Sequence, residues 1–262
     1  MSGKMQPTKE EIERETETFK ETATPELKES LYVHEVYNEI ASHFSNTRYK
    51  PWPFVQQFLE ELPKYSLGVD VGCGNGKYLN VNNDLFILGS DYSTGLIDQA
   101  QQLHMGEYNN DVLVADGLSL PHPTDCFDFA ISIAVIHHLS TEERRQDAIR
   151  EILRVLKPCG RALIYCWALE QEHSRRGYHE GMDQDILVPW VLMKKQTKKK
   201  KLKLASVSCV VEPELKPDSK MRYYHLYKKG ELAEDCKNAG GKVVQSGYER
   251  DNWWTIVEKK HC

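Results

Sequence analysis

An apolar segment that ends in an acid and continues into three alternating glycines occupies residues 67–78. The apolar residues before Asp70 predict a buried strand. Gly72, Gly74 and Gly76 then permit a tight turn whose backbone can approach a ligand closely. We interpret the stretch as a nucleotide-type cofactor loop. Because glycine-rich turns also serve as plain structural bends, the neighbouring segments decide between the two interpretations.

Two further apolar segments end in a carboxylate. Residues 85–91 end at Asp91, about where a β-α-β unit places the acid that binds ribose hydroxyls. Residues 111–117 repeat the pattern, and Asp116 can accept a hydrogen bond from an exocyclic amine such as that of adenine. We therefore expect Asp70, Asp91 and Asp116 to converge on one cofactor.

The competing cofactor is a dinucleotide, whose fingerprint has glycine at the sixth motif position so that phosphate can bind the helix N-terminus. That position is Lys77 here, and the carboxylate of Asp70 would repel phosphate. A phosphate-free, zwitterionic nucleoside fits better. The loop resembles motif I of class I S-adenosylmethionine-dependent methyltransferases. This resemblance implies cofactor contacts from Arg48, Asp70, Gly72, Cys73, Gly74, Asn75, Gly76, Asp91, Asp116 and Gly117.

Strands and helices alternate from the glycine loop onward, which predicts an α/β fold with a doubly wound parallel sheet. Helices are expected at about 31–44, 53–62, 94–104, 141–155 and 230–239, and strands at 127–134, 242–248 and 253–257. Ser93 or Thr94 should cap the third of these helices. The last strand is expected to be the antiparallel member of a seven-stranded sheet. The resemblance makes this a Rossmann-like class I methyltransferase fold.

A chain of 262 residues with 40% hydrophobic content can bury one substantial core, so we expect one catalytic domain over residues 31–262. Residues 1–30 carry eight acids and five basic residues, and we expect them to form an acidic, disordered or partly helical arm. A lysine-rich mobile insertion is expected at about 194–220.

Composition also bears on the compartment. No apolar run approaches the roughly 20 residues of a membrane span, and the first residues lack the apolar core of a secretory signal. We expect a soluble protein of the cytoplasm, or also of the nucleus. Seven widely spaced cysteines without a Cys-x-x-Cys pair predict reduced thiols and no intrinsic zinc site. Cys73 is interpreted as a small side chain that fits the loop rather than as a nucleophile.

Residues 37–44 resemble the lid segment that precedes motif I in many small class I methyltransferases. In that segment an aromatic side chain and a downstream arginine cover the methionine end of the cofactor. The resemblance implies that Arg48 faces the cofactor carboxylate. The alternative is a surface arginine on a loop.

His137 and His138 follow the predicted strand 127–134, at the sheet edge where ligands bind. A metal site would lack a third ligand at local spacing, and general-base chemistry would need a pKa that the sequence does not reveal. Related methyltransferases often place a histidine near the methyl group at this turn. We expect His137 to line the active site; the alternative is a structural histidine with satisfied hydrogen bonds.

Residues 167–185 combine paired arginines with histidines and aromatic residues. Guanidinium groups bind carboxylate or phosphate and aromatic faces stack on bases, so this segment suits an anionic, planar ligand. We expect Arg175, Arg176, Trp167, Tyr178 and His179 to belong to the site. A solvated polar insertion is the alternative.

Seven lysines lie within residues 194–203 of a chain whose net charge is -5. Such a run can bind a phosphate backbone through a sequence-independent, salt-dependent attraction. A flexible linker or a localisation signal would have the same composition.

Several longer strings resemble the eukaryotic tRNA wobble-uridine carboxymethyl methyltransferases, in particular the fungal form. They are residues 32–41, 47–53, 70–78, 130–135, 164–171, 174–182 and 249–254. The resemblance covers about residues 32–258. It implies an O-methyltransferase that converts 5-carboxymethyluridine of the tRNA anticodon to its methyl ester, with Tyr49, Tyr178, Asn252 and Trp253 near the substrate. Asn252 and Trp253 could instead serve only a hairpin turn.

The resemblance also implies a partner and a mechanism. The family acts with a small zinc-binding activator subunit, for which we expect a docking edge near residues 112–120. A carboxylate is ionised at neutral pH, so its attack on a sulfonium methyl group needs positioning rather than a general base. We expect Arg175 or Arg176 to hold it, with His137, Trp167 and His179 shaping the pocket. A small-molecule methyltransferase for quinones or sterols, or a non-catalytic cofactor-binding scaffold, are the alternatives.

Overall fold

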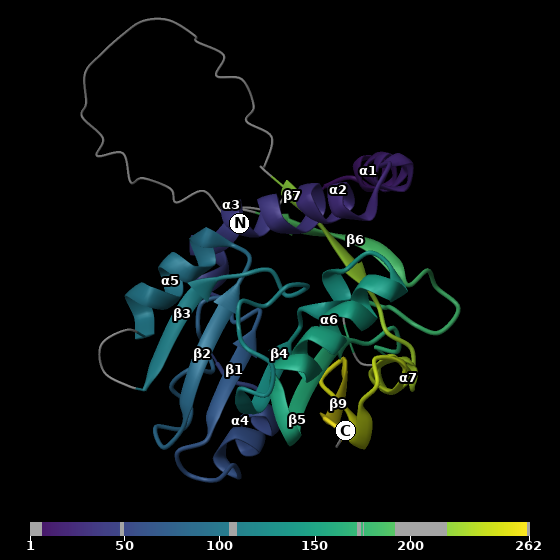
Figure 1. Cartoon of the computed structure of the whole chain (residues 1–262). Coiled ribbons are helices and arrows are strands. Elements are labelled where there is room, and N and C mark those ends of the chain that lie inside the picture. Colours follow the sequence, from purple (N-terminus) through teal and green to yellow (C-terminus); the bar gives the residue numbers. More distant parts are fainter. Residues whose placement is uncertain are drawn as a thin grey trace, which may run out of the picture.

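The computed structural model describes residues 7–47, 50–104, 109–171, 174, 176–191 and 219–260. Its centre is a seven-stranded sheet with the order β3-β2-β1-β4-β5-β9-β8 (Figure 1). These strands are β1 (Leu67–Val71), β2 (Phe86–Asp91), β3 (Asn110–Val114), β4 (Phe127–Ile133), β5 (Leu156–Trp167), β8 (Lys242–Glu249) and β9 (Asn252–Glu258). The first five pair in parallel, whereas β9 is antiparallel to β5 and β8. The predicted sheet is therefore confirmed.

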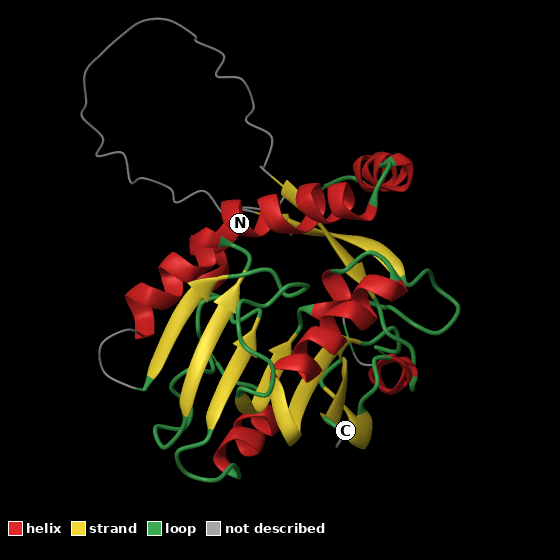
Figure 2. Cartoon of the chain, in the orientation of Figure 1, coloured by secondary structure: helices red, strands yellow, loops and turns green. Residues whose placement is uncertain are grey.

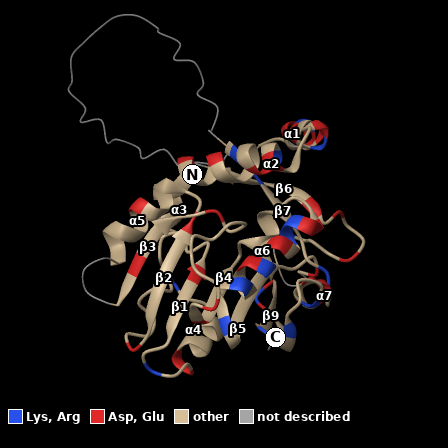
Figure 3. Cartoon of the chain, in the orientation of Figure 1, with Lys and Arg blue, Asp and Glu red and all other residues tan. Residues whose placement is uncertain are grey.

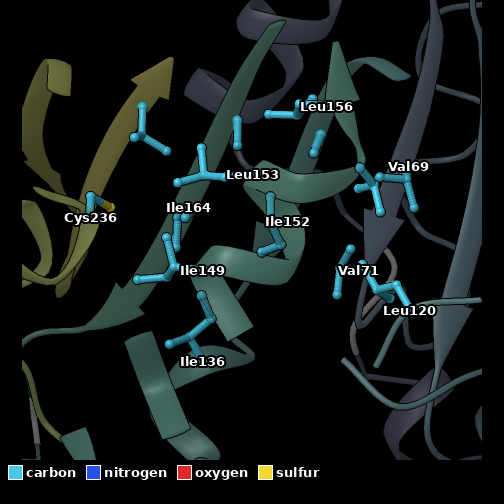
Figure 4. Packing of buried hydrophobic residues seen from close by; sticks show 14 of the residues in the cluster. Val69, Val71, Leu120, Ile136, Ile149, Ile152, Leu153, Leu156, Ile164 and Cys236 are labelled. Carbon is cyan, nitrogen blue, oxygen red and sulfur yellow. The ribbon is translucent and has the colours of Figure 1, made fainter. Parts of the chain in front are cut away.

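Helices cover both faces of this sheet, as Figure 2 shows. α4 (Pro53–Glu60) and α5 (Thr94–His104) pack on one face, and α6 (Glu142–Val155) and α7 (Glu231–Asn238) pack on the other. Successive side chains of a strand point to opposite faces. Along β5, Ile164 accordingly joins Ile149 and Ile152 of α6 (Figure 4), whereas Leu163 and Tyr165 pack on the α4 and α5 side. Burial on both faces explains why the central strands read as continuous apolar runs.

Side-chain caps set the starts of two of these helices. Ser93 Oγ accepts a hydrogen bond from the backbone N–H of Leu96 at 3.2 Å, so Ser93 caps the first turn of α5. Thr141 Oγ1 accepts from the N–H of Arg144 at 3.3 Å and caps α6. The helices predicted at 94–104 and 141–155 are confirmed to within one residue.

The N-terminal helices pack against the body of the molecule. They are α1 (Lys9–Glu21), α2 (Pro25–Glu29), the short π-helical turn η1 (Ser30–His34) and α3 (Glu35–Ser45). The ring of Phe19 stacks on Tyr223 with 4.8 Å between centroids, and Glu29 is buried. The described part of segment 1–30 is largely helical, which is one of the two expected alternatives, and it packs in part on the rest of the molecule. Glu29 can leave water because Arg144 neutralises it.

The structure also contains a second sheet that the sequence does not predict. β6 (Asp185–Val191) pairs antiparallel with β7 (Ser219–His225) at the end of the molecule where β1 to β3 point (Figure 1). The lysine-rich insertion expected at 194–220 lies outside the described residues, except for Ser219 and Lys220 in β7. Across the described ranges, no helix is both long and apolar enough to cross a membrane.

Candidate functional site

A cavity of about 400 Å³ lies at the carboxyl ends of the parallel strands, between α3 and the β6–β7 hairpin. This is the edge at which open α/β sheets bind ligands, and the volume suits a nucleoside-sized molecule. The lining comes from the glycine loop, the three acid-bearing strand ends, α3 and the hairpin. It includes Tyr37, Asp70, Gly72, Gly74, Asp91, Asp116, His138, Trp167, Arg176, Arg222, Tyr224 and Asn252.

The glycine loop has the backbone conformation that its sequence requires. Gly72 and Gly74 have φ angles of 80° and 58°, in the left-handed region that favours glycine. A Cβ atom on Gly72 would lie 2.2 Å from the Val135 side chain. Gly72, Cys73, Gly74 and Asn75 line the cavity. Gly76 does not: a Cβ there would meet His104 of α5 at 2.8 Å, so this glycine serves helix packing.

Asp70 at the end of β1 is a buried carboxylate, only 1% exposed. Within the described part of the chain neither of its oxygens has a hydrogen-bond partner. Burial raises its pKa to about 8; Lys77 opposes this shift and Asp91 adds to it. A buried carboxylate without a partner is costly, and a cationic ligand group in the cavity would satisfy it.

Asp91 and Asp116 reach the same cavity from β2 and from the segment after β3. Asp91 accepts hydrogen bonds from the N–H groups of Gly74 and Ser93, both at 2.9 Å, and so fixes the glycine loop against the start of α5. Burial raises its pKa, although these two bonds oppose the shift. Asp116 accepts from the N–H of Leu118 at 2.9 Å, and Gly117 lies beside it in the lining. The expected convergence of three acids is present in the structure.

The two histidines after β4 lie in the 3-10 turn η2 (Ile136–His138) and differ from the prediction. His137 is fully buried and is absent from the cavity lining; its Nδ1 accepts a hydrogen bond from the N–H of Trp167 at 3.0 Å. The lining histidine is instead His138. The phase of this short turn decides which ring faces the cavity, and the sequence does not reveal that phase.

His138 has a defined tautomer. Its Nδ1–H donates to the carbonyl of Tyr223 at 2.7 Å, which leaves Nε2 to accept from the Tyr37 hydroxyl at 3.0 Å. Burial lowers its pKa to about 3, with the bond to Tyr223 opposing the shift. Burial also lowers the pKa of His137 well below its ordinary value. Both rings are therefore neutral near pH 7 and serve as fixed polar contacts.

The segment predicted to bind substrate contributes a stacked wall. The Arg176 guanidinium lies 4.1 Å from the ring centroid of Trp167, and Trp167 stacks on Tyr224 at 4.3 Å. All three line the cavity. Tyr178 packs near this wall outside the lining, and exposed His179 pairs its Nδ1 with the carbonyl of its neighbour Glu180, so neither shapes the cavity directly.

The remaining predicted site residues fall into three groups. Asn252 lines the cavity, whereas Trp253 donates its Nε1–H to Glu170 at 2.9 Å and lies outside the lining. Arg48, Tyr49 and Arg175 lie outside the described residues.

A cationic group on β7 is missed by reasoning from the sequence. Arg222 lines the cavity yet is only 4% exposed. Its guanidinium carbon lies 4.6 Å from the ring centroid of Trp190, 5.2 Å from that of Tyr224 and 5.7 Å from that of Tyr37. The spacing of Arg222 and Tyr224, which puts both side chains on one face of a strand, is the signal that could have found it, but only once this stretch is recognised as a strand.

Comparisons with known proteins agree with this geometry. A family model described as a methyltransferase domain matches residues 69–164. The tRNA (carboxymethyluridine(34)-5-O)-methyltransferase of Saccharomyces cerevisiae is 51% identical over 274 residues, covering 89% of this chain and 97% of that protein. The protein of the same name from Schizosaccharomyces pombe is 49% identical, covering 88% of this chain and 97% of that protein.

Solved structures share the fold at low sequence identity. A chain in the complex between the Haloferax volcanii Trm112 methyltransferase activator and a methyltransferase has a TM-score of 0.61 at 16% identity, covering 88% of this chain and 98% of that one. An S-adenosylmethionine-dependent methyltransferase from Methanosarcina mazei has a TM-score of 0.56 at 15% identity, covering 80% and 99%. Both likenesses support the predicted architecture.

Proposed function

Because this chain belongs to the family of S-adenosylmethionine-dependent tRNA (carboxymethyluridine(34)-5-O)-methyltransferases, we propose that it methylates the carboxylate of 5-carboxymethyluridine at tRNA position 34. The observation that carries the proposal is the near full-length match to two relatives of this activity. The cavity supports it, since it combines a glycine loop and three acids with a cationic, aromatic wall.

The described residues fit the cofactor. The unpartnered carboxylate of Asp70 suits the ammonium group of its methionine part, and the glycine loop at Gly72 and Gly74 lines the cavity beside it. Asp91 and Asp116 offer further acceptors for ribose hydroxyls and for the adenine amine. When bound, S-adenosylmethionine supplies an electrophilic methyl group and a neutral sulfur leaving group.

The residues of the chain contribute positioning rather than proton transfer. The accepting carboxylate loses no proton in the reaction, because it is already ionised at neutral pH. His138, with its pKa lowered to about 3 by burial, is matched to this chemistry as a neutral hydrogen-bonding group. Trp167 and Tyr224 offer faces on which a base can stack, and Arg176 adds a charge for a phosphate or a base edge.

We also propose a small activator subunit as partner. The structure named for the Haloferax volcanii activator and a methyltransferase supports it. β3 is an edge strand of the sheet, and Val114 on it is 50% exposed. Unpaired backbone groups and the exposed Val114 on an edge strand suit a docking partner. Val112 and Leu120, at the two ends of the edge expected near residues 112–120, are buried.

The decisive experiment is nucleoside analysis of tRNA. tRNA that carries 5-carboxymethyluridine is incubated with the chain, methyl-labelled S-adenosylmethionine and the activator, and the digested nucleosides are separated. We expect label in the methyl ester nucleoside. A quinone or sterol acceptor labelled in place of tRNA would favour the small-molecule class, and cofactor binding without transfer to any acceptor would indicate a scaffold.

A further inference from the structure

We propose that Arg222 binds the carboxylate of the methyl acceptor in a buried cationic subsite, which Tyr37, Trp190 and Tyr224 enclose. This inference rests on the proposed function and deepens it, because it assigns the acceptor's charged group to a residue of β7. From the sequence alone, that task is expected of Arg175 or Arg176.

Arg222 is a buried charge without a counter-charge in the described fold. A guanidinium has five N–H donors, and here Nη1 donates to the Tyr37 hydroxyl at 3.2 Å, whereas Nε has no partner within the described residues. Nor does an acid of the described residues form an ion pair with it. Burial of an unpaired ion is unfavourable, so an anion bound in the cavity would relieve a penalty that the free chain carries.

Arg144 and Arg145, adjacent in the sequence, are arginines outside the cavity, and each has an acidic partner. Arg145 is as buried as Arg222, at 4% exposure, and its Nε likewise lacks a hydrogen-bond partner within the described residues, but this atom lies 4.0 Å from the counter-charge at Oδ2 of Asp235. Arg144 binds Glu29 at 2.7 Å. Neither lines the cavity. Of these three arginines, the one that lines the cavity, Arg222, is thus the one whose counter-charge the described fold does not supply.

The directions of the hydrogen bonds made by the Tyr37 and Tyr224 hydroxyls hold Arg222 in place. Because His138 Nε2 accepts the hydroxyl proton of Tyr37, the Tyr37 oxygen is left as an acceptor. It receives Nη1 of Arg222 at 3.2 Å, and the Tyr224 hydroxyl lies at 3.2 Å and can donate to it. This chain of bonds fixes Arg222 between aromatic rings. The fixed guanidinium needs no reorganisation to receive a carboxylate.

The position of Arg222 separates the acceptor carboxylate from that of the cofactor. Arg222 shares Tyr224 with the stacked wall of Trp167 and Arg176, on the side of the cavity suited to a base. Burial is the largest cause that lowers the pKa of His138, and the charge of Arg222 lowers it further. The pKa of Asp70 is instead raised by burial and by Asp91 and lowered by Lys77. Arg222 therefore belongs with the acceptor wall rather than with the glycine loop. Arg176 is left to contact phosphate or base.

The test compares Arg222→Met and Arg222→Lys with Arg145→Met, a control that removes a buried arginine outside the cavity. We expect Arg222→Met to lower kcat/KM for RNA bearing 5-carboxymethyluridine about a hundredfold, as removal of a charge-assisted pair implies. Calorimetry should show S-adenosylmethionine affinity unchanged within about twofold, because Arg222 lies with the stacked wall of Trp167 and Tyr224 rather than with the glycine loop. The melting temperature of free Arg222→Met should equal or exceed that of the wild type, whereas Arg145→Met should melt lower.

A binding measurement removes the dependence on turnover. Wild-type protein should bind an anticodon stem-loop with 5-carboxymethyluridine more tightly than one with the neutral 5-carbamoylmethyluridine, and Arg222→Met should lose this preference. A retained preference, or weakened cofactor affinity in its place, would overturn the inference. If Arg222→Met does not fold, wild-type kinetics in Arg222→Lys would overturn it. If the wild type forms no methyl ester, the proposed function fails, while the binding preference still decides the role of Arg222.

Discussion

Single residues carry the chemistry of this site, and Asp70 shows how. Its carboxylate is enclosed at the end of β1 without a hydrogen-bond partner among the described residues, and burial raises its pKa to about 8. In the free chain it is therefore mostly protonated at pH 7. An ammonium group in the cavity favours the ionised form, so cofactor binding should release a proton.

The affinity for S-adenosylmethionine should accordingly rise with pH. As the pH rises toward about 8, the dissociation constant should decrease by up to about tenfold for each pH unit. Above about pH 8 it should become constant. Calorimetry between about pH 6.5 and 9, in buffers of different ionisation enthalpy, measures both the affinity and the proton released. Asp70→Asn should remove the dependence. An equally steep dependence in Asp70→Asn would assign it to another group.

Local sequence rules place some site residues and miss others. The acids and glycines were predictable because strand ends converge at one sheet edge and because left-handed turns select glycine. Which of His137 and His138 faces the cavity could not be predicted, since it depends on the phase of one short turn. Arg222 was missed because its partner Tyr37 lies 185 residues away in the chain.

At the scale of elements, one ion pair with a buried acid links the N-terminal helices to the rim of the site. Glu29 at the end of α2 is 1% exposed and accepts from Arg144 Nη2 at 2.7 Å and from the N–H of Ser140 at 2.8 Å. Ser140 follows directly after the His138–Leu139 turn. The position of α2 and the shape of the cavity rim are thereby linked.

Removing the charge of Glu29 should destabilise the protein. We expect Glu29→Gln to lower the free energy of unfolding by about 2 kcal/mol, because it leaves Arg144 without its buried partner. Glu26→Gln is the matched control: Glu26 also binds Arg144 at 2.7 Å, but its side chain is 64% exposed. The control should change stability much less than Glu29→Gln in urea unfolding, because solvent screens the exposed carboxylate of Glu26. Equal effects would contradict the role of burial.

His225 connects the hairpin to α7. Its Nδ1 lies 2.9 Å from Asp185, and its Nε2 lies 2.8 Å from Glu231. Burial lowers the pKa of His225, but its bonds to the two carboxylates outweigh this effect and leave the pKa above its ordinary value of 6.5. The stability that charged His225 contributes is therefore fully present below about pH 6.5 and is lost as the pH rises through the raised pKa.

His225→Gln should therefore be most destabilising in mild acid. We expect a decrease in stability of about 1 to 2 kcal/mol at about pH 6 that shrinks toward about pH 9, because the wild type then loses the same charge. The pKa values of Asp185 and Glu231 are lowered, against the effect of burial and chiefly by their hydrogen bonds to His225, so their own contribution fades only as the pH falls below about 4.5. Urea unfolding of both proteins at three pH values measures the difference. A constant difference would exclude a charged His225.

Periodic elements were predictable, and the hairpin was not. α5 and α6 have strong periodicity and caps, and β4 is a continuous apolar run. The structure confirms all three nearly to the residue. β6 and β7 are separated in sequence by residues 192–218, so the sequence contains no short hairpin turn from which their pairing could be predicted. Long-range pairing of this kind depends on the tertiary contacts of the cavity wall.

At the scale of the whole molecule, charge is unevenly distributed along the chain. Acidic and basic residues are mixed along α6 (Figure 3), and the net charge of the chain is -5. The seven lysines of residues 194–203 depart from this mixing, because they form a run of one sign of charge. In the sequence this run lies between β6 and β7, the two strands of the hairpin beside the cavity. They remain a predicted RNA-binding segment.

Replacing these seven lysines with serine should weaken tRNA binding more at low salt than at high salt. For every lysine that no longer pairs with a phosphate, the slope of log affinity against log salt should decrease in magnitude by about 0.7 to 0.9. Fluorescence titration at several salt concentrations measures the slope, and Lys228→Ser with Lys229→Ser, outside the run, is the control. An unchanged slope would identify the run as a linker or a localisation signal.

The uncompensated cation of Arg222 has a consequence for turnover. Esterification erases the negative charge that attracts the acceptor, so the finished nucleoside occupies a site that no longer favours it and leaves the guanidinium uncompensated again. Expulsion of the product is then driven by the reaction itself. Fully modified tRNA should consequently be a poor inhibitor, and one encounter should suffice for each anticodon.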